Sequence, residues 1–313
     1  MDKKIAHGLM FHRFHKSGSE PDGQGSLTEK DLEKIINSKG RKRILNADEW
    51  ISRLNTNNLN TDDLCMTFDD GLKSQYEIAV PVLNKYSIKA FFFIYSSVFF
   101  DNNLNKNEIY NKFAITKFKS FDKFVDFFFK QNSNLEKSFS HNDFKIYTED
   151  MKSKFPFYSI NDLKFRFIRN NILTRIEFEN VMDELMFVKD ININNFSSKI
   201  WMDNKDIQDL SANNHCIGLH SFSHPFNISN LDLIDQKNEY TKNYNHIKET
   251  VGVRPISMSH PLNSYSCKTI DILKNLGVKC GFCSNINTKQ IYDTNKINTF
   301  EIPREDGVNL ILR

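Results

Sequence analysis

Short apolar runs alternate with amphipathic stretches over both ends of the chain. Runs of strand length lie at 5–12, 64–68, 89–95 and 216–219. Toward the C-terminus, a helical pattern over 235–250 precedes an apolar run at 256–259, and one over 268–276 precedes a run at 278–283. Two last strands are expected near 300–303 and 308–312. Strands that alternate with helices predict a parallel sheet, either open or closed into a barrel.

Local signals mark several helix ends. Ser26 and Glu29 have the spacing of a capping box, so a helix is expected to begin there. Pro81 is expected to bend the helix that begins near residue 76. Asp203 is expected to cap a helix that ends near Asn213-Asn214, where a left-handed residue would stop it.

The middle of the chain breaks this alternation. Residues 101–200 are rich in Asn, Lys and Phe, and Phe118, Phe121 and Phe124 have helical spacing. We therefore expect a single domain over 1–313 that carries an inserted, mostly helical subdomain at 101–200. The phenylalanines are interpreted as the core of this insert, and a lid is the alternative.

Composition excludes several classes of protein. Lys and Arg number 42 against 39 Asp and Glu, and this balance argues against a nucleic-acid-binding protein. The apolar runs are too short for a transmembrane segment, and the N-terminus lacks the apolar core of a signal peptide. Five cysteines, an odd number without dense spacing, favour a reducing compartment. The expected location is the cytoplasm.

Polar motifs follow two of the predicted strands. Thr67–Gly71 places two adjacent carboxylates at a strand end, where a bound cation would relieve their repulsion and leave one of them free as a base. His220–Pro225 places two imidazoles four residues apart. Two imidazoles and one carboxylate leave coordination positions open, as catalytic metal sites require. Taken singly, the first motif also suits a turn and the second a surface loop. Their occurrence together at strand ends favours a metal site.

The two motifs together resemble those of the polysaccharide deacetylase family, the NodB-homology domain of carbohydrate esterase family four. The resemblance covers about 1–100 and 200–313 and implies a distorted parallel (β/α) barrel, here with a helical insertion. It also implies that Asp69 is the general base and that Asp70, His220 and His224 bind a divalent metal. Zinc is the default expectation, and Co, Ni or Fe suit the same ligands.

The chain departs from the family's pattern in two places. The third motif, Arg-x-Pro-aromatic, is matched only by Pro261, within Ser259-His260-Pro261-Leu262. We expect His260 and Pro261 to contact the substrate, and the Leu262 backbone N–H to donate to an oxyanion. Arg304 is predicted to replace the missing Arg beside Asp69.

The family's C-terminal Leu-x-His is also absent from this chain. His12 is the candidate general acid in its place, because it ends the first strand and so lies on the same rim. His15 and His260 are further candidates.

These features predict a metal-dependent hydrolase that removes an N-acetyl or similar acyl group from an amino sugar. The expected substrate is a nucleotide-linked or lipid-linked sugar or a surface-polysaccharide precursor. One alternative is a deformylase or another hydrolase of non-peptide amides on the same scaffold. The other is a non-catalytic carbohydrate-binding protein.

Overall fold

The computed structural model describes residues 5–21, 23, 25–100, 106–154, 158–197, 199–286 and 298–312. The chain divides into two compact units. The barrel unit comprises Met1–Ser19, Gly25–Asn105 and Lys199–Arg313, and the helical unit comprises Glu20–Gln24 and Lys106–Ser198.

Seven parallel strands form the core of the barrel unit, in the order β6-β5-β4-β3-β2-β1-β7. The apolar runs of the sequence form these strands because parallel strands are covered on both faces. The strands are β1 (His7–Phe11), β2 (Leu64–Asp69), β3 (Phe91–Ile94), β4 (Cys216–Leu219), β5 (Ser257–Ser259), β6 (Cys280–Phe282) and β7 (Arg304–Asp306).

The segment 299–306 brings the two edges of this sheet together. Its first half is hydrogen-bonded to β6, where Gly281 N donates to Thr299 O (2.8 Å) and Ile302 N donates to Gly281 O (3.0 Å). Its second half is β7, which pairs with β1. The sheet is therefore a nearly closed parallel barrel, and the predicted fold class is confirmed.

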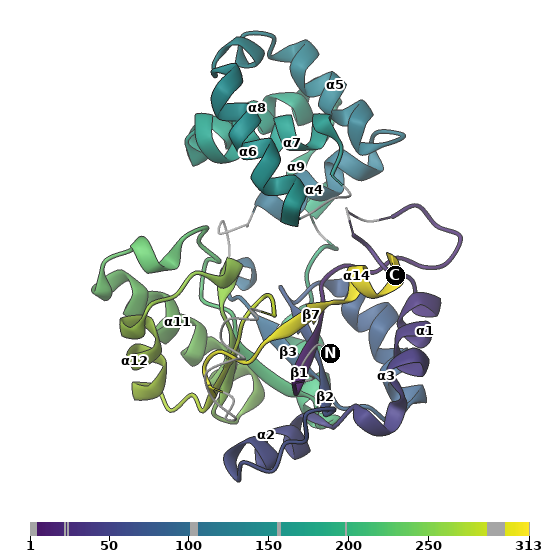
Figure 1. Cartoon of the computed structure of the whole chain (residues 1–313), viewed down its shortest axis with the longest axis vertical. Helices are drawn as coiled ribbons and strands as arrows, with labels where there is room; N and C mark the ends of the chain where they lie inside the picture. The colour runs from purple at the N-terminus through teal and green to yellow at the C-terminus, as the bar shows by residue number, and fades with distance from the viewer. Residues whose placement is uncertain are drawn as a thin grey trace. The chain divides into compact units, whose positions relative to one another are not determined.

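Helices cover the outside of the strands, as Figure 1 shows for α1, α3, α11 and α12. The helices of this unit are α1 (Glu29–Lys39), α2 (Ala47–Asn55), α3 (Val80–Lys85), α10 (Asn204–Ala212), α11 (Leu233–Val251), α12 (Cys267–Asn275) and α14 (Gly307–Leu312). The predicted cap is confirmed, since the Asp203 side chain accepts from Asp206 N at the start of α10. Asn214 follows the end of α10 in the left-handed conformation, with φ 64°.

Four expectations about local structure differ in detail from the structure. The capping box of α1 is formed by Thr28 and Asp31, because the Ser26 hydroxyl is instead hydrogen-bonded to His15 Nδ1 (2.9 Å). The helix before Pro81 widens into a π-helical turn over Gln75–Ala79, and Pro81 lies in the first turn of α3. Proline is tolerated in the first turn of a helix because a backbone N–H at that position would have no partner within the helix.

The third error concerns the C-terminus, where 308–312 forms α14 and not a strand. Asp306 Oδ1 accepts from Val308 N (2.9 Å) at its start, and the side chains of Val308 and Ile311 pack against the barrel core at helical spacing. The strand expected at 300–303 is displaced, since only Ile302 forms a bridge and β7 begins at Arg304.

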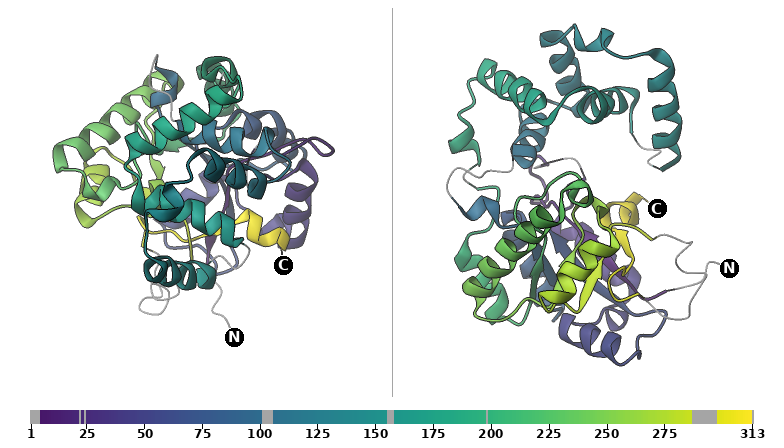
Figure 2. Two further views of the ribbon diagram at one scale, coloured as in Figure 1. Left: turned by 90° about the horizontal axis from the view of Figure 1, so that it is seen from above. Right: turned by 90° about the vertical axis from the view of Figure 1, so that its left-hand side faces the viewer.

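The helical unit, drawn in teal in Figure 2, is built around phenylalanine. Phe124 and Phe128 are fully buried, and their ring centroids lie 5.3 and 5.1 Å from that of Phe165 in edge-to-face contacts. Its helices are α4 (Lys106–Thr116), α5 (Phe121–Gln131), α6 (His141–Lys154), α7 (Ile160–Phe167), α8 (Arg175–Val188) and α9 (Ile193–Ser197). The unit covers most of the segment expected to form an insert, and its role as a lid stays a prediction.

Among the described helices, none combines the length and the continuous apolar sequence needed to cross a bilayer.

Gly218 in β4 offers a test of the packing that supports the barrel rim. A Cβ atom at this position would lie 2.7 Å from Phe93 Cδ1 and 2.6 Å from Ser257 Oγ. We expect Gly218→Ala to lower the free energy of unfolding by roughly 1–3 kcal/mol, because both neighbours belong to packed strands. Urea denaturation measures this loss, and a change below about 0.5 kcal/mol would contradict the close packing.

Candidate metal centre and active site

The predicted site residues follow the carboxyl ends of neighbouring strands. His12 comes after β1, Asp69 ends β2 and Asp70 follows it, His220 comes after β4, and His260 comes after β5. Because the strands are parallel, these ends share one rim of the barrel, where active sites of such folds lie.

Asp70, His220 and His224 converge on one point of this rim. Asp70 Oδ1 lies 3.5 Å from His220 Nε2 and 3.6 Å from His224 Nε2. One potential ligand atom from each residue lies within 4.8 Å of the others. Among the described residues, this is the one group of three or more His, Cys, Asp or Glu side chains with such spacing.

The hydrogen bonds of the site suit a metal. His220 Nδ1 donates to Ser259 O (2.9 Å), so Nε2, which lies 3.5 Å from Asp70 Oδ1, is the ring nitrogen that could bind a metal. Burial lowers the pKa of His224 to about 4, so its imidazole is neutral at neutral pH, as a ligand must be. Burial opposes ionisation of Asp70, but the hydrogen bond with His220 outweighs it and lowers the pKa of Asp70. The donor set, one carboxylate and two imidazoles, fits a divalent cation.

The backbone around these ligands is strained. Three non-glycine residues have positive φ values, which are 78° at Asp70, 62° at Ser221 and 51° at His224. Such conformations are costly and persist only where the surroundings hold them, and they are concentrated at functional sites.

Asp69 is held by a buried ion pair. Arg304 Nη1 and Nη2 donate to its two carboxylate oxygens at 2.7 and 2.8 Å, and Ser259 Oγ donates to Oδ2 at 3.0 Å. Burial alone would raise the pKa of Asp69, but the charges of Arg304 and His220 lower it to about 2. The predicted pairing of Arg304 with Asp69 is therefore present, and the carboxylate is ionised at neutral pH.

Arg304 reaches Asp69 by a route that the sequence did not indicate. It was expected to follow a strand, but it opens β7 and pairs with Gly8. Its side chain runs through the barrel interior and donates to Cys283 O (2.6 Å) and Thr67 Oγ1 (3.2 Å). A Cβ atom on Gly8 would lie 3.0 Å from Arg304 Cγ, so glycine leaves room for this path.

His12 lies near both carboxylates and contributes, less than Arg304 at Asp69 and less than His220 at Asp70, to the lowering of their pKa values. Gln75 joins the two strand ends, since its Nε2 donates to His12 O (2.8 Å) and Asp69 O (2.5 Å). Gln75 is fully buried and was missed in the sequence because a lone glutamine in a helix carries no motif.

The turn after β5 contains the remaining predicted residues. Leu262 has a φ of 49° and a side chain that is half exposed, while Pro261 is buried. His260 is buried, stacks on Tyr265 at 4.0 Å between ring centroids, and donates from Nε2 to Phe300 O (2.8 Å). Burial lowers its pKa to about 4. These contacts favour a structural role for His260 over contact with substrate or proton donation.

Two further features were missed by sequence analysis. Ser259 was treated only as a departure from the motif, yet it contacts both Asp69 and His220. Tyr95 lies after β3 with its ring centroid 5.5 Å from that of His224, and its hydroxyl accepts from Trp201 Nε1. The partly exposed Trp201 is thus linked to His224 through Tyr95, a connection that only the fold makes.

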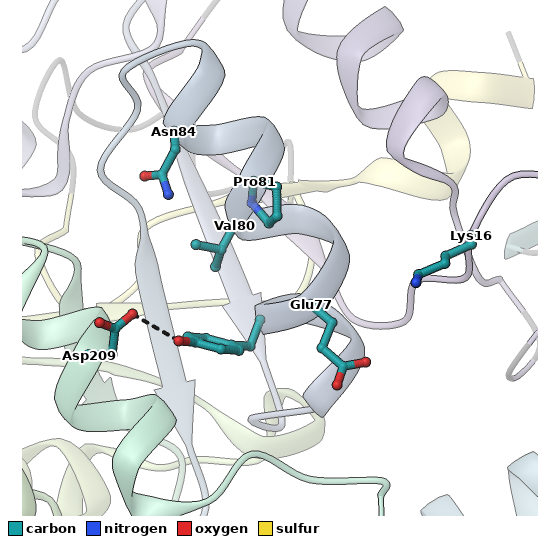
Figure 3. Close-up of a pocket in the computed structure, with 7 residues that line it drawn as sticks. Lys16, Glu77, Val80, Pro81, Asn84 and Asp209 are labelled. Atoms are coloured by element: carbon teal, nitrogen blue, oxygen red, sulfur yellow. Dashed lines mark hydrogen bonds between the residues drawn. The ribbon is translucent and has the colours of Figure 1, made fainter.

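A surface pocket on the outside of the barrel unit is separate from these residues. It is lined by Lys16, residues of the helical segment around Tyr76, and Asp209 of α10, with a hydrogen bond of 3.0 Å from Tyr76 to Asp209 (Figure 3). None of the predicted site residues lines it.

Comparisons with known structures show the same fold. The deacetylase PplD of Streptococcus pyogenes, solved in complex with acetate, is 13% identical with a TM-score of 0.52, and 98% of this chain and 96% of that chain are covered. IcaB from Ammonifex degensii is 14% identical with a TM-score of 0.55, with 97% and 91% covered. A de-N-acetylase from Aggregatibacter actinomycetemcomitans is 13% identical with a TM-score of 0.54, with 96% and 95% covered. No curated protein matches the chain.

A family model provides the evidence from sequence. The model described as polysaccharide deacetylase matches residues 56–114 and 179–281, a little over half of the chain. The matched ranges contain Asp69, Asp70, His220 and His224, the residues that meet at the barrel rim. The chain belongs to the polysaccharide deacetylase family.

Proposed function

We propose that the protein is a metal-dependent hydrolase that removes an N-acetyl group from an amino sugar. The observation that carries this proposal is the position of an ionised, non-ligating Asp69 beside the Asp70–His220–His224 group. His220 Nε2 lies 4.0 Å from Asp69 Oδ2, so the Asp69 carboxylate lies beside the point where the three proposed ligands converge. Membership of the deacetylase family and the fold shared with a de-N-acetylase support the same reaction.

Asp70, His220 and His224 would hold the metal. Zinc is the expected ion, and Co, Ni or Fe suit the same donors. When bound, such an ion supplies Lewis acidity and lowers the pKa of water toward ~7.

The protein's own side chains would carry the proton transfers. Asp69 accepts the proton of the attacking water at a carboxylate oxygen, while Arg304 and Ser259 orient that carboxylate. The Leu262 N–H donates to the oxyanion, which develops on the carbonyl oxygen when water adds to the acyl carbon. His12, as an imidazolium, donates a proton to the amide nitrogen as the C–N bond breaks. The products are a carboxylate and a free amine.

The first test separates the metal ligand from the base. Asp70→Asn should lose both bound zinc and acetate release from UDP-N-acetylhexosamines and lipid-linked N-acetyl sugars, because it removes the anionic ligand. Asp69→Asn should keep the metal but lose turnover by about 10²–10⁴-fold, because it removes the proton acceptor. Zinc content is measured by atomic emission and acetate by a coupled assay.

The alternatives give different results in the same assays. Formate release without acetate indicates the deformylase reaction. Wild-type protein that binds zinc and an acyl sugar but releases no product is a carbohydrate-binding protein. Asp69→Asn with wild-type turnover would contradict the assignment of the base.

Arg304 is expected to set the pH range of the reaction. In Arg304→Met the buried Asp69 loses its main counter-charge, so its pKa should rise from about 2 and the acid limb of kcat/KM should move to higher pH. The variant should also lose roughly 3–5 kcal/mol of stability, because a buried charge is left unpaired. Arg304→Lys, which keeps a positive charge, is the control and should show a smaller shift.

The stability effect has a defined pH range. The pKa of Asp69 is lowered from 3.8 to about 2 on folding, so the pair's contribution is present above about pH 4 and is lost as the pH falls toward 2. A folded Arg304→Met protein with an unchanged acid limb would disprove this role for Arg304.

His12 is expected to act on the leaving group alone. His12→Ala should lower turnover by about 10²–10⁴-fold and leave zinc content unchanged, because the amine would have to depart without a proton. His15→Ala is the matched control and should keep wild-type turnover, since His15 is hydrogen-bonded to Ser26 on the neighbouring loop. Full activity in His12→Ala would remove His12 from the mechanism.

A further inference from the structure

One face of α11 is polar where it packs against the barrel rim. Glu239, Asn243 and His246 are spaced four and three residues apart, so they lie on the same side of the helix. Asn243 and His246 are buried, and Glu239 is partly buried. Buried polar side chains need partners, and the partners of Glu239 and Asn243 lie in and beside the loop that carries His220 and His224.

The carboxylate of Glu239 binds the middle of that loop. Its Oε2 accepts from Phe222 N (3.0 Å) and Ser223 N (2.8 Å), and its Oε1 accepts from Ser223 Oγ (2.8 Å). Both oxygens are therefore used, and all three donors lie between the two histidine ligands. Hydrogen bonds to an ionised acceptor are roughly twice as strong as those between neutral groups.

The rest of the loop is held by Asn243 and by the end of β3. Asn243 Oδ1 accepts from His220 N (2.9 Å), and its Nδ2 donates to Ile94 O (2.9 Å). Ser96 N and Ser97 N donate to Phe222 O (3.0 and 2.8 Å). Phe222 is thus bound on both sides of its backbone, by the segment that follows β3 through its carbonyl and by Glu239 through its N–H.

These contacts hold a loop whose backbone is strained. Ser221 and His224 both have positive φ, and the two residues between them donate to Glu239. A strained loop relaxes when the groups that hold it are removed. Relaxation at this position would move His224 Nε2 away from Asp70 Oδ1.

We propose that Glu239 is a positioning residue for the metal ligands, which holds the 220–224 loop so that His224 is ready to bind. The proposal rests on the proposed metal centre and extends it to α11. Partners of this kind, which orient ligands without touching the metal, change metal affinity by 10–100-fold when removed.

The test compares Glu239→Gln with Glu249→Gln. Glu249 is an exposed carboxylate on the same helix, so both variants lose one negative charge and only one loses the contact with the loop. The amide of glutamine is uncharged and has a single acceptor oxygen, so the hydrogen bonds from Phe222 N and Ser223 N lose the strength that an ionised acceptor gives them, while the Ser223 hydroxyl can at best accept from the NH₂ group. We expect zinc affinity, measured by competition with a chromophoric chelator, to fall 10–100-fold in Glu239→Gln and to stay unchanged in Glu249→Gln.

Two further measurements separate positioning from a general loss of structure. The visible spectrum of the Co²⁺-loaded protein should change in Glu239→Gln, because the coordination geometry is altered, while thermal unfolding of the metal-free protein should stay close to wild type. Ser223→Ala removes one of the three hydrogen bonds and should weaken zinc binding by a smaller factor, which keeps the test valid if Glu239→Gln does not fold.

Unchanged zinc affinity and an unchanged cobalt spectrum in Glu239→Gln would overturn this proposal while leaving the metal centre intact. Wild-type protein that binds no zinc or cobalt would overturn the metal centre itself. Wild-type protein that binds zinc but releases no acyl group would count against the hydrolase alone, and the comparison of the two glutamate variants would still decide the role of Glu239.

Discussion

Asp69 and Arg304 form an ion pair in which both side chains are almost fully buried. A carboxylate buried without a partner would take up a proton and could not serve as a base near neutral pH. Arg304 meets Asp69 because the segment 299–306 closes the barrel, first along β6 and then as β7 along β1. The charge state of the proposed base therefore depends on closure of the barrel, although Arg304 and Asp69 lie 235 positions apart in the chain.

Ser259 links this ion pair to the proposed metal ligands. Its hydroxyl donates to Asp69 and accepts from Arg304, and its carbonyl accepts from His220. Ser259 thus occupies the position where the resemblance led us to expect the arginine of the third motif. Arg304 of β7 supplies the positive charge instead. The guanidinium that is missing from this motif is supplied in space by Arg304, because the ion pair needs a guanidinium near Asp69 and not one from a particular strand.

The sequence patterns predicted helices and strands correctly where the secondary structure that a segment prefers locally is also the one that packs in the fold. Apolar runs such as 216–219 became strands with unchanged bounds, and Asp203 caps α10 as its residue type favours. The errors lie where a tertiary contact decides between local options. Ser26 is bonded to His15 and leaves the cap to Thr28, and 308–312 packs on the core as a helix although its apolar residues suit a strand equally well.

The sequence by itself determined the residue types at the strand ends, and with them the candidate ligands Asp70, His220 and His224. Their spacing is local, and strands of a parallel sheet necessarily bring their carboxyl ends to one rim. Only the tertiary structure decided which further distant groups contact the proposed site residues, among them Gln75 and Glu239. Each of these residues acts through hydrogen bonds to a segment far away in the chain. A side chain from almost any neighbouring element can make such a contact, so the contact leaves no periodicity or motif in the sequence.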